Sequence, residues 1–589
     1  MAYEVKTRIV FDDNTKIEII SSIEIKEILF GHHVFTVEVP FSQIENKQQH
    51  GFFKDSYQKY LGKAINIYII NQRYLRGKPV EYVFRGIVTG VSMARTASDA
   101  ESVVVLSGFS PTILLDTGPV KKTFAQKNIE DIVNGAIKAV NSSFLSNAEI
   151  KPRKKVSWKY TIQFNETHFH FMSRLADISN EWFYYDGKKI CLGDPKGGNV
   201  QLGFDKDLID INLGMQVLPS TIESQFYHYQ NDKLVAKDST GIAVSGLASL
   251  NDFSLKQSGN LFKQKTTTNY STHLRSDGDL TNTLKNQKTR IANSMVEITG
   301  SSVYPDIHIG YQVQILGSNR VDRRSEHKDY GTYRVTGITH LVRDNMYTNI
   351  FTAIPKSSGV EFPPVNLNLS VTRADPEYAI VKDNKDPKGL GRVKVQTQWQ
   401  KGNDTTPWIR LANQMSGSEY GFYFVPEIGE QVIVGYELGN PQLPIVMGSA
   451  YHGKAKQPDK KHDQNFKKGI KTKSGNEILI IDEKGKEIIQ IKNPKGENQI
   501  TLTMDGKGKI KVESKGDIEL IAKDIIKMES QKIILDAKQE VNIKAGTKIK
   551  TSTANTQIES SAQTKLRSSQ LEVDGGTAAN IRAGIIKLN

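Results

Sequence analysis

The sequence has very little cysteine and no long apolar run. Cys191 is the only cysteine among 589 residues, so the chain can form neither an intrachain disulfide nor a cysteine-rich metal site. No stretch approaches the roughly 18 to 20 apolar residues needed to cross a bilayer. The first residues also lack the apolar core of a secretory signal. We therefore expect folding in a reducing cytoplasm, and no export by the general secretory route.

Aromatic residues are missing from the last fifth of the chain. From Lys471 to Asn589 there is no Phe, Trp, Tyr, His or Cys. In their place, pairs of apolar residues two positions apart recur about every eight residues, a step typical of a repeat architecture. The clearest pairs are Ile510/Val512, Ile518/Leu520, Ile526/Met528, Ile533/Leu535 and Val541/Ile543.

This repeat predicts strands that need partner chains. Residues two apart lie on one face of a strand, so each unit is expected to be a short strand and a turn. A lone strand cannot bury two aliphatic side chains, and eight residues are too few for one coil of a single-chain solenoid. Three chains wound around each other give the smallest closed ring with an enclosed core. The ten paired residues are the predicted core of that trimer, and the missing aromatics fit its narrow interior.

The rest of the chain is predicted to be mainly β, with a few helices. Residues 1–365 contain strand-like runs and two helical stretches, Ile129–Val140 and Glu166–Asn180, the second capped by Thr167. Residues 377–453 hold five short strand-like segments punctuated by Gly and Pro, which suits a small Greek-key barrel of the OB type. The five are Gly391–Trp399, Pro407–Leu411, Gly421–Pro426, Glu427–Gly435 and Pro444–Gly448. Residues 454–470 are predicted to be a linker, and residues 471–589 the β-repeat.

Several motifs in order carry a family resemblance. They are Gly391–Val395, Pro407–Arg410, Gly421–Val434, Gly439–Ser449, the segment Tyr160–Leu175 followed by Trp182–Tyr185, and Thr472–Asn476. Together they resemble the VgrG spike proteins of bacterial type VI secretion systems, which are related to the hub and spike proteins of contractile phage tails. The resemblance implies a hub of tandem β-barrel domains over residues 1–365, an OB-fold collar, and a trimeric β-helical needle.

The resemblance also implies partners and a location. The chain would be a homotrimer that caps a hexameric tube protein at the hub and carries a PAAR-type tip protein at the needle end, with effector proteins and chaperones as further partners. The residues placed to bind the tip protein are Ile585, Ile586, Leu588 and Asn589. Such a protein resides in the cytoplasm before firing and is then secreted into a target cell or the medium. The same fold also serves extracellular contractile particles and phage-like tails, and the sequence does not separate these alternatives.

Other classes of function find less support in the sequence. The net charge of +14 invites a nucleic-acid interpretation, and Trp399 and Trp408 are candidate stacking platforms on an OB barrel that binds nucleic acid or carbohydrate. His168 and His170 are a weak candidate for a metal site, because side chains two positions apart point in different directions on a helix. Gly108–Pro111 lacks the second glycine of a nucleophile elbow, and no paired carboxylates mark a polysaccharide-active enzyme. We expect no enzyme, no cofactor and no metal site.

Overall fold

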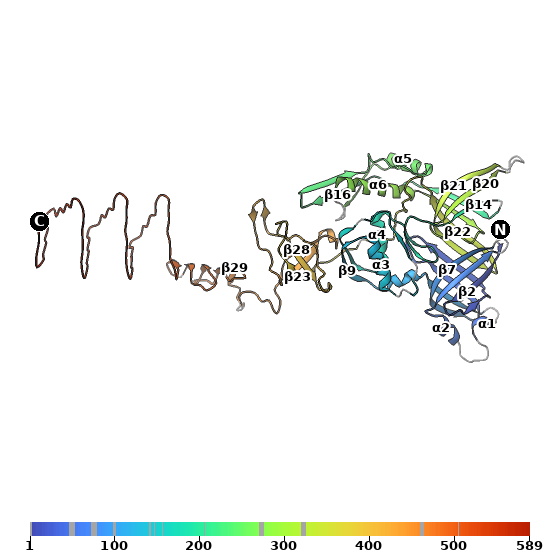
Figure 1. The fold of residues 1–589 in the computed structure, drawn as a ribbon, viewed down its shortest axis with the longest axis horizontal. Helices are drawn as coiled ribbons and strands as arrows, with labels where there is room; N and C mark the ends of the chain where they lie inside the picture. Colours follow the sequence, from blue (N-terminus) through green and yellow to red (C-terminus); the bar gives the residue numbers. More distant parts are fainter. Residues whose placement is uncertain are drawn as a thin grey trace. The chain divides into compact units, whose positions relative to one another are not determined.

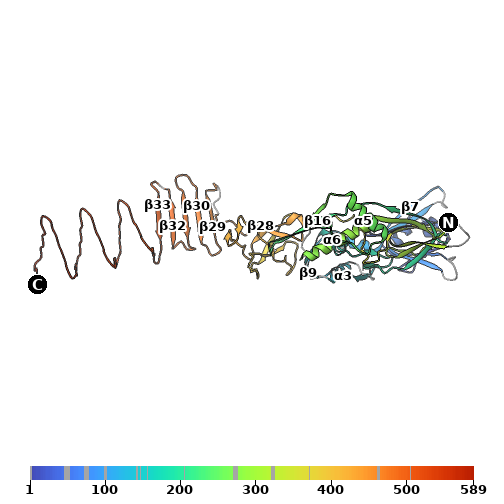
Figure 2. The same ribbon diagram turned by 90° about the horizontal axis from the view of Figure 1, so that it is seen from above.

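The computed structural model divides the chain into two compact units, Met1–Gln457 and Pro458–Asn589. Strands dominate the first unit, whereas the second has strands followed by a winding trace (Figures 1 and 2). No helix of the described part is both long and apolar enough to span a membrane. The structure describes residues 3–45, 53–71, 79–97, 102–140, 143–145, 148–155, 157–204, 206–269, 276–319, 326–370, 372–459, 464–504 and 506–588.

Most strands of the first unit form one 14-stranded sheet. Its order is β15-β19-β22-β21-β4-β5-β8-β7-β6-β2-β3, with β1 paired to β22 and with β14 joined through β20 to β21. The strands are β1 Tyr3–Glu4, β2 Lys6–Phe11, β3 Lys16–Ile17, β4 Ser22–Ile28, β5 Val34–Pro40, β6 Ala64–Asn71, β7 Val80–Ala94, β8 Val103–Phe109, β14 Asn199–Gly203, β15 Leu208–Met215, β19 Val296–Ser302, β20 Gln312–Asn319, β21 Glu326–Arg343 and β22 Met346–Pro355.

The sheet joins two halves of the hub along one strand pair. Strand β4 belongs to the first half and pairs antiparallel with β21 of the second, from Ser22 opposite Arg343 to Ile28 opposite Gly337. We call this pairing the hub seam. Each half has its own buried apolar cluster, because alternate residues of the strands face inward. On β4 the inward positions are Ile23, Ile25 and Glu27, and the last of these is a charged residue in an apolar layer.

Helices and small sheets complete the hub. The helices are α1 Phe41–Ile44, α2 Lys54–Tyr60, η1 Pro111–Asp116, α3 Ile129–Ala139, α4 His168–Ser179, α5 Ser249–Leu261 and α6 Asp277–Asn293. The smaller sheets contain β9 Val120–Lys127 with β11 Trp158–Glu166; β10 Ala148–Lys151, β12 Phe183–Tyr185 and β13 Ile190–Gly193; and β16 Ile222–His228, β17 Lys233–Asp238 and β18 Thr266–Asn269. The two predicted helices are confirmed as α3 and α4, and Thr167 caps α4 by accepting a hydrogen bond from the His170 amide at 3.1 Å. Glu166, predicted as helical, ends β11 instead.

The OB segment differs in detail from the prediction. Its sheet has the order β24-β23-β27-β28, and the segment also holds a short hairpin. The elements are β23 Glu377–Asp383, β24 Lys394–Thr397, β25 Ser416–Gly417, β26 Tyr420–Gly421, β27 Gln431–Tyr436, η2 Glu437–Gly439 and β28 Pro444–Ser449. The sequence prediction missed β23, which no Gly-rich motif marks. It also expected a strand at residues 407–411, where only two isolated bridges form, through Ile409 and Leu411.

The second unit begins with an antiparallel meander of five strands. They are β29 Lys467–Lys471, β30 Glu477–Ile481, β31 Ile488–Lys492, β32 Gln499–Thr503 and β33 Lys509–Glu513. Successive strands begin 10 or 11 residues apart, a longer step than the eight residues found further on. Strand β29 begins at Lys467, so it includes the last four residues of the segment 454–470 predicted to be a linker.

Residues 514–588 contain no helix or strand, and residues 515–588 are all exposed. Their backbone winds back and forth without pairing to itself (Figures 1 and 2). In one chain alone the unit of Ile510 and Val512 forms strand β33 and the later units form none, so strands built with partner chains stay a prediction. The physical reason is that a strand requires a hydrogen-bonded neighbour, and an eight-residue step leaves none within the same chain.

Candidate functional site: the aliphatic face of the second unit

One face of the meander consists almost entirely of exposed aliphatic side chains. The register places Ile491 opposite Ile478 on one side and opposite Ile500 on the other, so the side chains form a continuous row across the strands. We call this surface the aliphatic face. Its members are between 38% and 73% exposed: Ile478, Ile480, Ile489, Ile491, Ile500, Leu502, Ile510 and Val512.

The opposite face carries polar side chains that hydrogen-bond to one another, together with the half-buried Leu479, Ile481 and Ile488. The Gln490 side-chain amide donates to Gln499 Oε1 at 2.9 Å and to Thr501 Oγ1 at 3.2 Å. Gln499 in turn donates to Glu513 Oε2 at 2.6 Å. Hydrogen bonds from Lys511 and Gln499 lower the pKa of Glu513, which keeps it ionised at neutral pH. The aliphatic face has no such polar network, and a large exposed apolar patch of this kind marks an interaction surface.

The aliphatic face contains two of the ten predicted core residues and six that the sequence analysis missed. Ile510 and Val512 lie on it, whereas the missed residues come from β30, β31 and β32. A signal for them exists in the turns. Gly475, Gly485, Gly496 and Gly506 recur at intervals of 10 or 11 residues, and each has a positive φ that favours glycine.

The other predicted core residues are exposed and touch no partner strand in the single chain. Their exposed fractions lie between 51% and 71%, and they are Ile518, Leu520, Ile526, Met528, Ile533, Leu535, Val541 and Ile543. The predicted tip-binding residues Ile585, Ile586 and Leu588 are exposed as well. Asn589 lies outside the described residues.

The OB segment adds a second exposed apolar surface. It lies along the β25–β26 hairpin and the residues next to it. Its members are Met415, Tyr420, Phe422, Tyr423, Phe424 and Ile428. We call it the aromatic strip. Its side chains are large and rich in rings, the kind that protein interfaces favour.

The two candidate stacking tryptophans have contacts within the chain. Trp399 is half-buried, donates from Nε1 to Glu377 Oε2 at 2.8 Å, and packs edge-on against Phe164 of β11. It therefore joins the OB segment to the β9–β11 pair. Trp408 is also half-buried, with the Lys394 ammonium 5.0 Å from its ring centroid.

The segment between hub and OB fold is tied down along its length. Residues 357–366 form no strand or helix, and we call them the strap. The Glu361 carboxylate accepts hydrogen bonds from Arg334 Nε at 3.0 Å and from Arg334 Nη2 at 2.7 Å. Its backbone carbonyl accepts a hydrogen bond from Trp182 Nε1 at 2.7 Å. Arg290 of α6 reaches the Pro363 carbonyl at 3.3 Å. The strap thereby fastens β21, the region around β12 and α6 to one another.

The candidate metal and nucleophile residues have ordinary structural contacts. His170 Nδ1 lies 3.0 Å from Glu166 Oε2, and its Nε2 lies 3.2 Å from Ser370 Oγ. Across the described ranges, no group of three His, Cys, Asp or Glu residues is arranged to hold a metal ion. Ser110 Oγ is buried, accepts from the His33 amide at 3.1 Å and shares a hydrogen bond with Thr112, which stands between it and the His32 ring.

A polar hollow between α3 and β10 also has its charges paired. The Glu149 carboxylate accepts hydrogen bonds from Lys189 at 2.8 Å, Lys151 at 3.0 Å and Lys196 at 3.1 Å. These hydrogen bonds lower its pKa to about 2, so the carboxylate stays ionised at neutral pH. A general acid requires the opposite shift.

Comparison with known proteins agrees with this architecture. The type VI secretion system/phage-baseplate injector OB domain family matches residues 378–451. The chain is 23% identical over 413 residues to the type VI secretion system spike protein VgrG1a of Pseudomonas aeruginosa, an alignment that covers 63% of this chain and 61% of that protein. It is 30% identical over 159 residues to the actin cross-linking toxin VgrG1 of Vibrio cholerae, which covers 25% of this chain and 14% of the toxin.

A solved structure shares the fold. The chain superimposes on the lidded Francisella PdpA-VgrG complex with a TM-score of 0.55 at 9% identity, covering 87% of this chain and 80% of that one. The mainly β architecture and the OB segment are thereby confirmed. The chain spans about three fifths of the length of VgrG1a. The resemblance noted in the sequence is confirmed: this chain is similar to the VgrG spike proteins of type VI secretion systems.

Proposed function

We propose that this chain is the structural hub and spike of a contractile injection machine, and that three copies form the working unit. The observation that carries the proposal is the aliphatic face. Eight aliphatic side chains lie exposed on one side of a sheet, and the other side holds a network of hydrogen-bonded polar groups. Burying an Ile or Leu side chain stabilises by roughly 1.5 to 3 kcal/mol, so a self-complementary assembly of these faces is strongly favoured.

A homotrimer fits this surface better than a dimer. Three sheets arranged around an axis enclose a closed core, and each aliphatic face then contacts two others. The eight-residue repeats that follow continue the same prism, with Ile518, Ile526 and Ile533 among the residues turned inward. The aromatic strip is covered by neighbouring copies in the same arrangement, as a collar above the needle.

The direct test is the mass of the full chain in solution. Sedimentation equilibrium should give three times the monomer mass at micromolar concentration, and negative-stain images should show a rod attached to a broader head. A monomer with a compact second unit would overturn the proposal. A stable dimer would preserve the interface but refute the three-fold arrangement.

The partners follow from the same proposal. The hub caps a hexameric tube protein, and a PAAR-type tip protein covers Ile585, Ile586, Leu588 and Asn589. Effector proteins and chaperones are further partners. The chain acts mechanically, resides in the cytoplasm before firing and is delivered outward with the tube. Pull-down of a ring-forming tube protein by the full chain, abolished on removing the hub, tests the first contact.

The proposed role is not enzymatic. The paired charges around Glu149 and the hydrogen-bonded Ser110 support that reading, as does similarity to proteins named as spikes. One matched relative is named a toxin, but the alignment covers 14% of it. The remaining alternative within the same class is the spike of an extracellular contractile particle or phage-like tail. Neighbouring genes for a membrane-anchored complex would favour the secretion system.

A further inference from the structure

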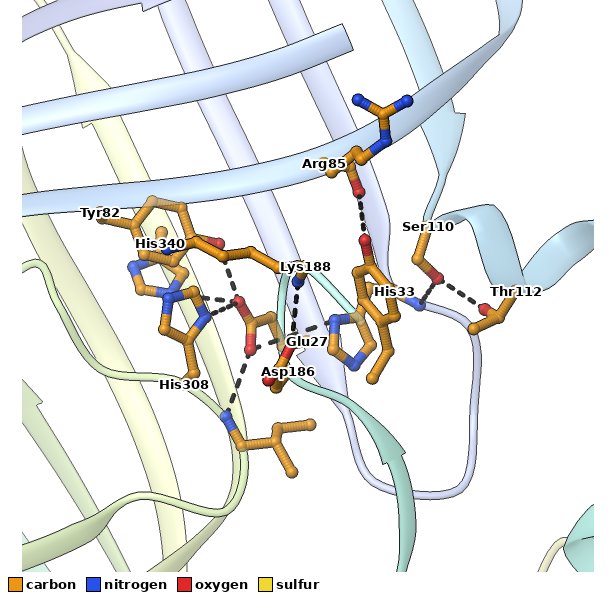
Figure 3. Close-up of polar contacts among 12 residues, drawn as sticks. Glu27, His33, Tyr82, Arg85, Ser110, Thr112, Asp186, Lys188, His308 and His340 are labelled. Atoms are coloured by element: carbon orange, nitrogen blue, oxygen red, sulfur yellow. Dashed lines mark hydrogen bonds and ion pairs between the residues drawn. The ribbon is translucent and has the colours of Figure 1, made fainter. Parts of the chain in front are cut away.

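The hub seam buries four ionisable side chains that the spike function does not use. Glu27 lies on β4, His33 follows β4, His308 precedes β20, and His340 lies on β21 (Figure 3). Their side chains are at most 3% exposed. We call them the buried histidine cluster. Buried ionisable groups are costly unless they are paired, so the partners of each one decide what the cluster does.

The Glu27 carboxylate already accepts three hydrogen bonds. Its Oε1 accepts from His308 Nδ1 at 2.9 Å and from the Tyr82 hydroxyl at 2.8 Å. Its Oε2 accepts from the Ile309 amide at 3.3 Å. Glu27 thus forms one ion pair across the two halves of the hub, with His308.

His340 is held in its neutral form by a tyrosine. Its Nδ1 lies 2.7 Å from the Tyr347 hydroxyl, which itself accepts a hydrogen bond from the Asn349 amide at 2.9 Å. The single hydroxyl proton of Tyr347 is then free to be donated to His340 Nδ1. The other ring nitrogen, Nε2, faces Glu27 Oε1 at 3.9 Å, beyond hydrogen-bond distance.

His33 is buried without a side-chain hydrogen bond to any described residue. Neither of its ring nitrogens has a hydrogen-bond partner among the described residues. Its Nδ1 lies 4.0 Å from Glu27 Oε2, beyond hydrogen-bond distance. The rings of Phe84 and Tyr185 pack around it. In the closed seam a proton added to His33 would have no acceptor within hydrogen-bond distance among the described residues.

The surroundings offer no second carboxylate to either histidine at close range. Asp306 lies against His308, with Oδ1 3.8 Å from Nε2. The titratable and charged groups that face the cluster from all packed elements are His32, Tyr82, Arg85, Tyr185, Asp186, Lys188, Asp306, Tyr311 and Tyr347.

The pKa shifts agree with this geometry. Burial lowers the pKa of His33 to about 4 and that of His340 to about 3, although Glu27 opposes both shifts. Burial also disfavours charge on His308, but Glu27 outweighs it and raises the pKa of His308. Burial raises the pKa of Glu27, yet His308 and the other imidazoles bring it down to about 2. At neutral pH His33 and His340 are therefore uncharged, and Glu27 is ionised and hydrogen-bonded to His308.

We propose that the buried histidine cluster is a proton-operated latch that holds β4 against β21 at neutral pH and loosens the hub seam in acid. A proton on His33 or His340 adds a positive charge that the closed seam cannot neutralise. Opening lets water solvate both rings and so favours the protonated state. A spike that enters an acidic compartment would have a loosened hub, whereas one in a neutral compartment would keep it closed.

The sign of the effect follows from proton linkage. In the open seam both histidines titrate at their ordinary value of 6.5, above their values in the closed seam. Between pH 6.5 and about 4 the open state therefore binds up to two more protons, and its population rises by up to about 100-fold per pH unit. His308 stabilises the closed seam below pH 6.5 and loses this effect as the pH rises through its raised pKa. Glu27 weakens the seam only below its ordinary value of 4.5.

Hydrogen exchange on the full chain tests the latch. Protection factors, corrected for the intrinsic pH dependence of exchange, are measured for β4 and β21 at pH 7.5 and pH 5.0. We expect at least a tenfold loss at pH 5.0 in both strands, while β27 of the OB segment is unchanged. The double variant His33→Leu with His340→Asn should keep its protection at pH 5.0, because neither new side chain can take up a proton.

A matched control and two outcomes decide the matter. The variant His452→Gln, at a half-exposed position after β28, should respond to pH as the wild type does. Equal loss in the wild type and the double variant would overturn the latch, as would unchanged seam protection in the wild type down to pH 4.5. The wild-type titration alone suffices if the double variant does not fold.

Discussion

The two units treat their aliphatic residues in opposite ways. In the first unit, Ile9, Ile25 and Val37 are completely buried in a core built by a single chain. In the second unit, residues of the same kind, such as Ile489, Ile491 and Ile500, are about half exposed. Composition therefore does not distinguish a self-sufficient domain from an interface; what distinguishes them is whether the chain returns to cover its own strands.

The difference has a simple geometric origin. Hub strands pair with segments far away in the sequence, such as β4 with β21, and form a large curved sheet that covers its own core. The meander pairs only consecutive strands, which gives a single layer with two bare faces. A single layer can satisfy one face with polar groups, but the apolar face needs another sheet. The second unit is therefore expected to depend on assembly, whereas the first is not.

Charges placed on the aliphatic face should have the largest effect. The double variant Ile489→Asp with Ile491→Asp would bury six carboxylates in a trimer, each at a cost of several kcal/mol. We expect sedimentation equilibrium to show that the needle trimer is lost at micromolar concentration. Thr501→Asp with Thr503→Asp on the polar face, opposite Lys511 and Lys509, is the matched control and should keep the trimer. Loss of assembly in both variants would contradict the assignment of the faces.

Cutting the chain between the units should separate the two behaviours. The fragment 1–457 is expected to unfold cooperatively on heating, near the temperature of the hub transition in the full chain. The fragment 458–589 should give a melting temperature that rises with protein concentration, because its folding is linked to association. Calorimetry at two concentrations checks both expectations. A concentration-independent transition for the second fragment would show that one chain covers its own aliphatic face.

Breaking the strap should weaken the hub and leave the needle assembled. Arg334→Met removes the partner of Glu361 in a mostly buried ion pair, which costs about 3 to 5 kcal/mol. Urea unfolding followed by tryptophan fluorescence measures the hub. Arg343→Met, at an exposed position on the same strand, is the control and should change stability little. An unchanged unfolding midpoint in Arg334→Met would mean that this contact of the strap does not contribute to the stability of the hub.

The smallest expected effect concerns the start of α4. Thr167→Ala removes the hydrogen bond to the His170 amide and should destabilise the hub by about 1 kcal/mol. Thr167→Ser keeps the hydroxyl and should restore most of the loss. The same urea titration resolves both. No difference between the Ala and Ser variants would show that another group caps the helix.

Much of the architecture could be predicted from sequence because the signals are local. The periodic apolar residues of α3 and the cap at Thr167 depend only on near neighbours, and both helices form as expected. The absence of aromatics after Lys471 and the alternation of Ile510 with Val512 marked an apolar face in need of partners. The Gly-rich motifs located the OB segment within the sequence, although they did not predict strand β23.

Tertiary structure alone decided which distant residues meet. Glu27, His308 and His340 are separated by up to 313 positions, and no local pattern joins them; only the pairing of β4 with β21 brings them into one buried space. The same holds for Glu361, whose partner Arg334 lies on another element. The sequence by itself determined that the second unit has an apolar face, because alternation within a strand is local. The hub seam depended on long-range strand pairing, which local alternation does not specify.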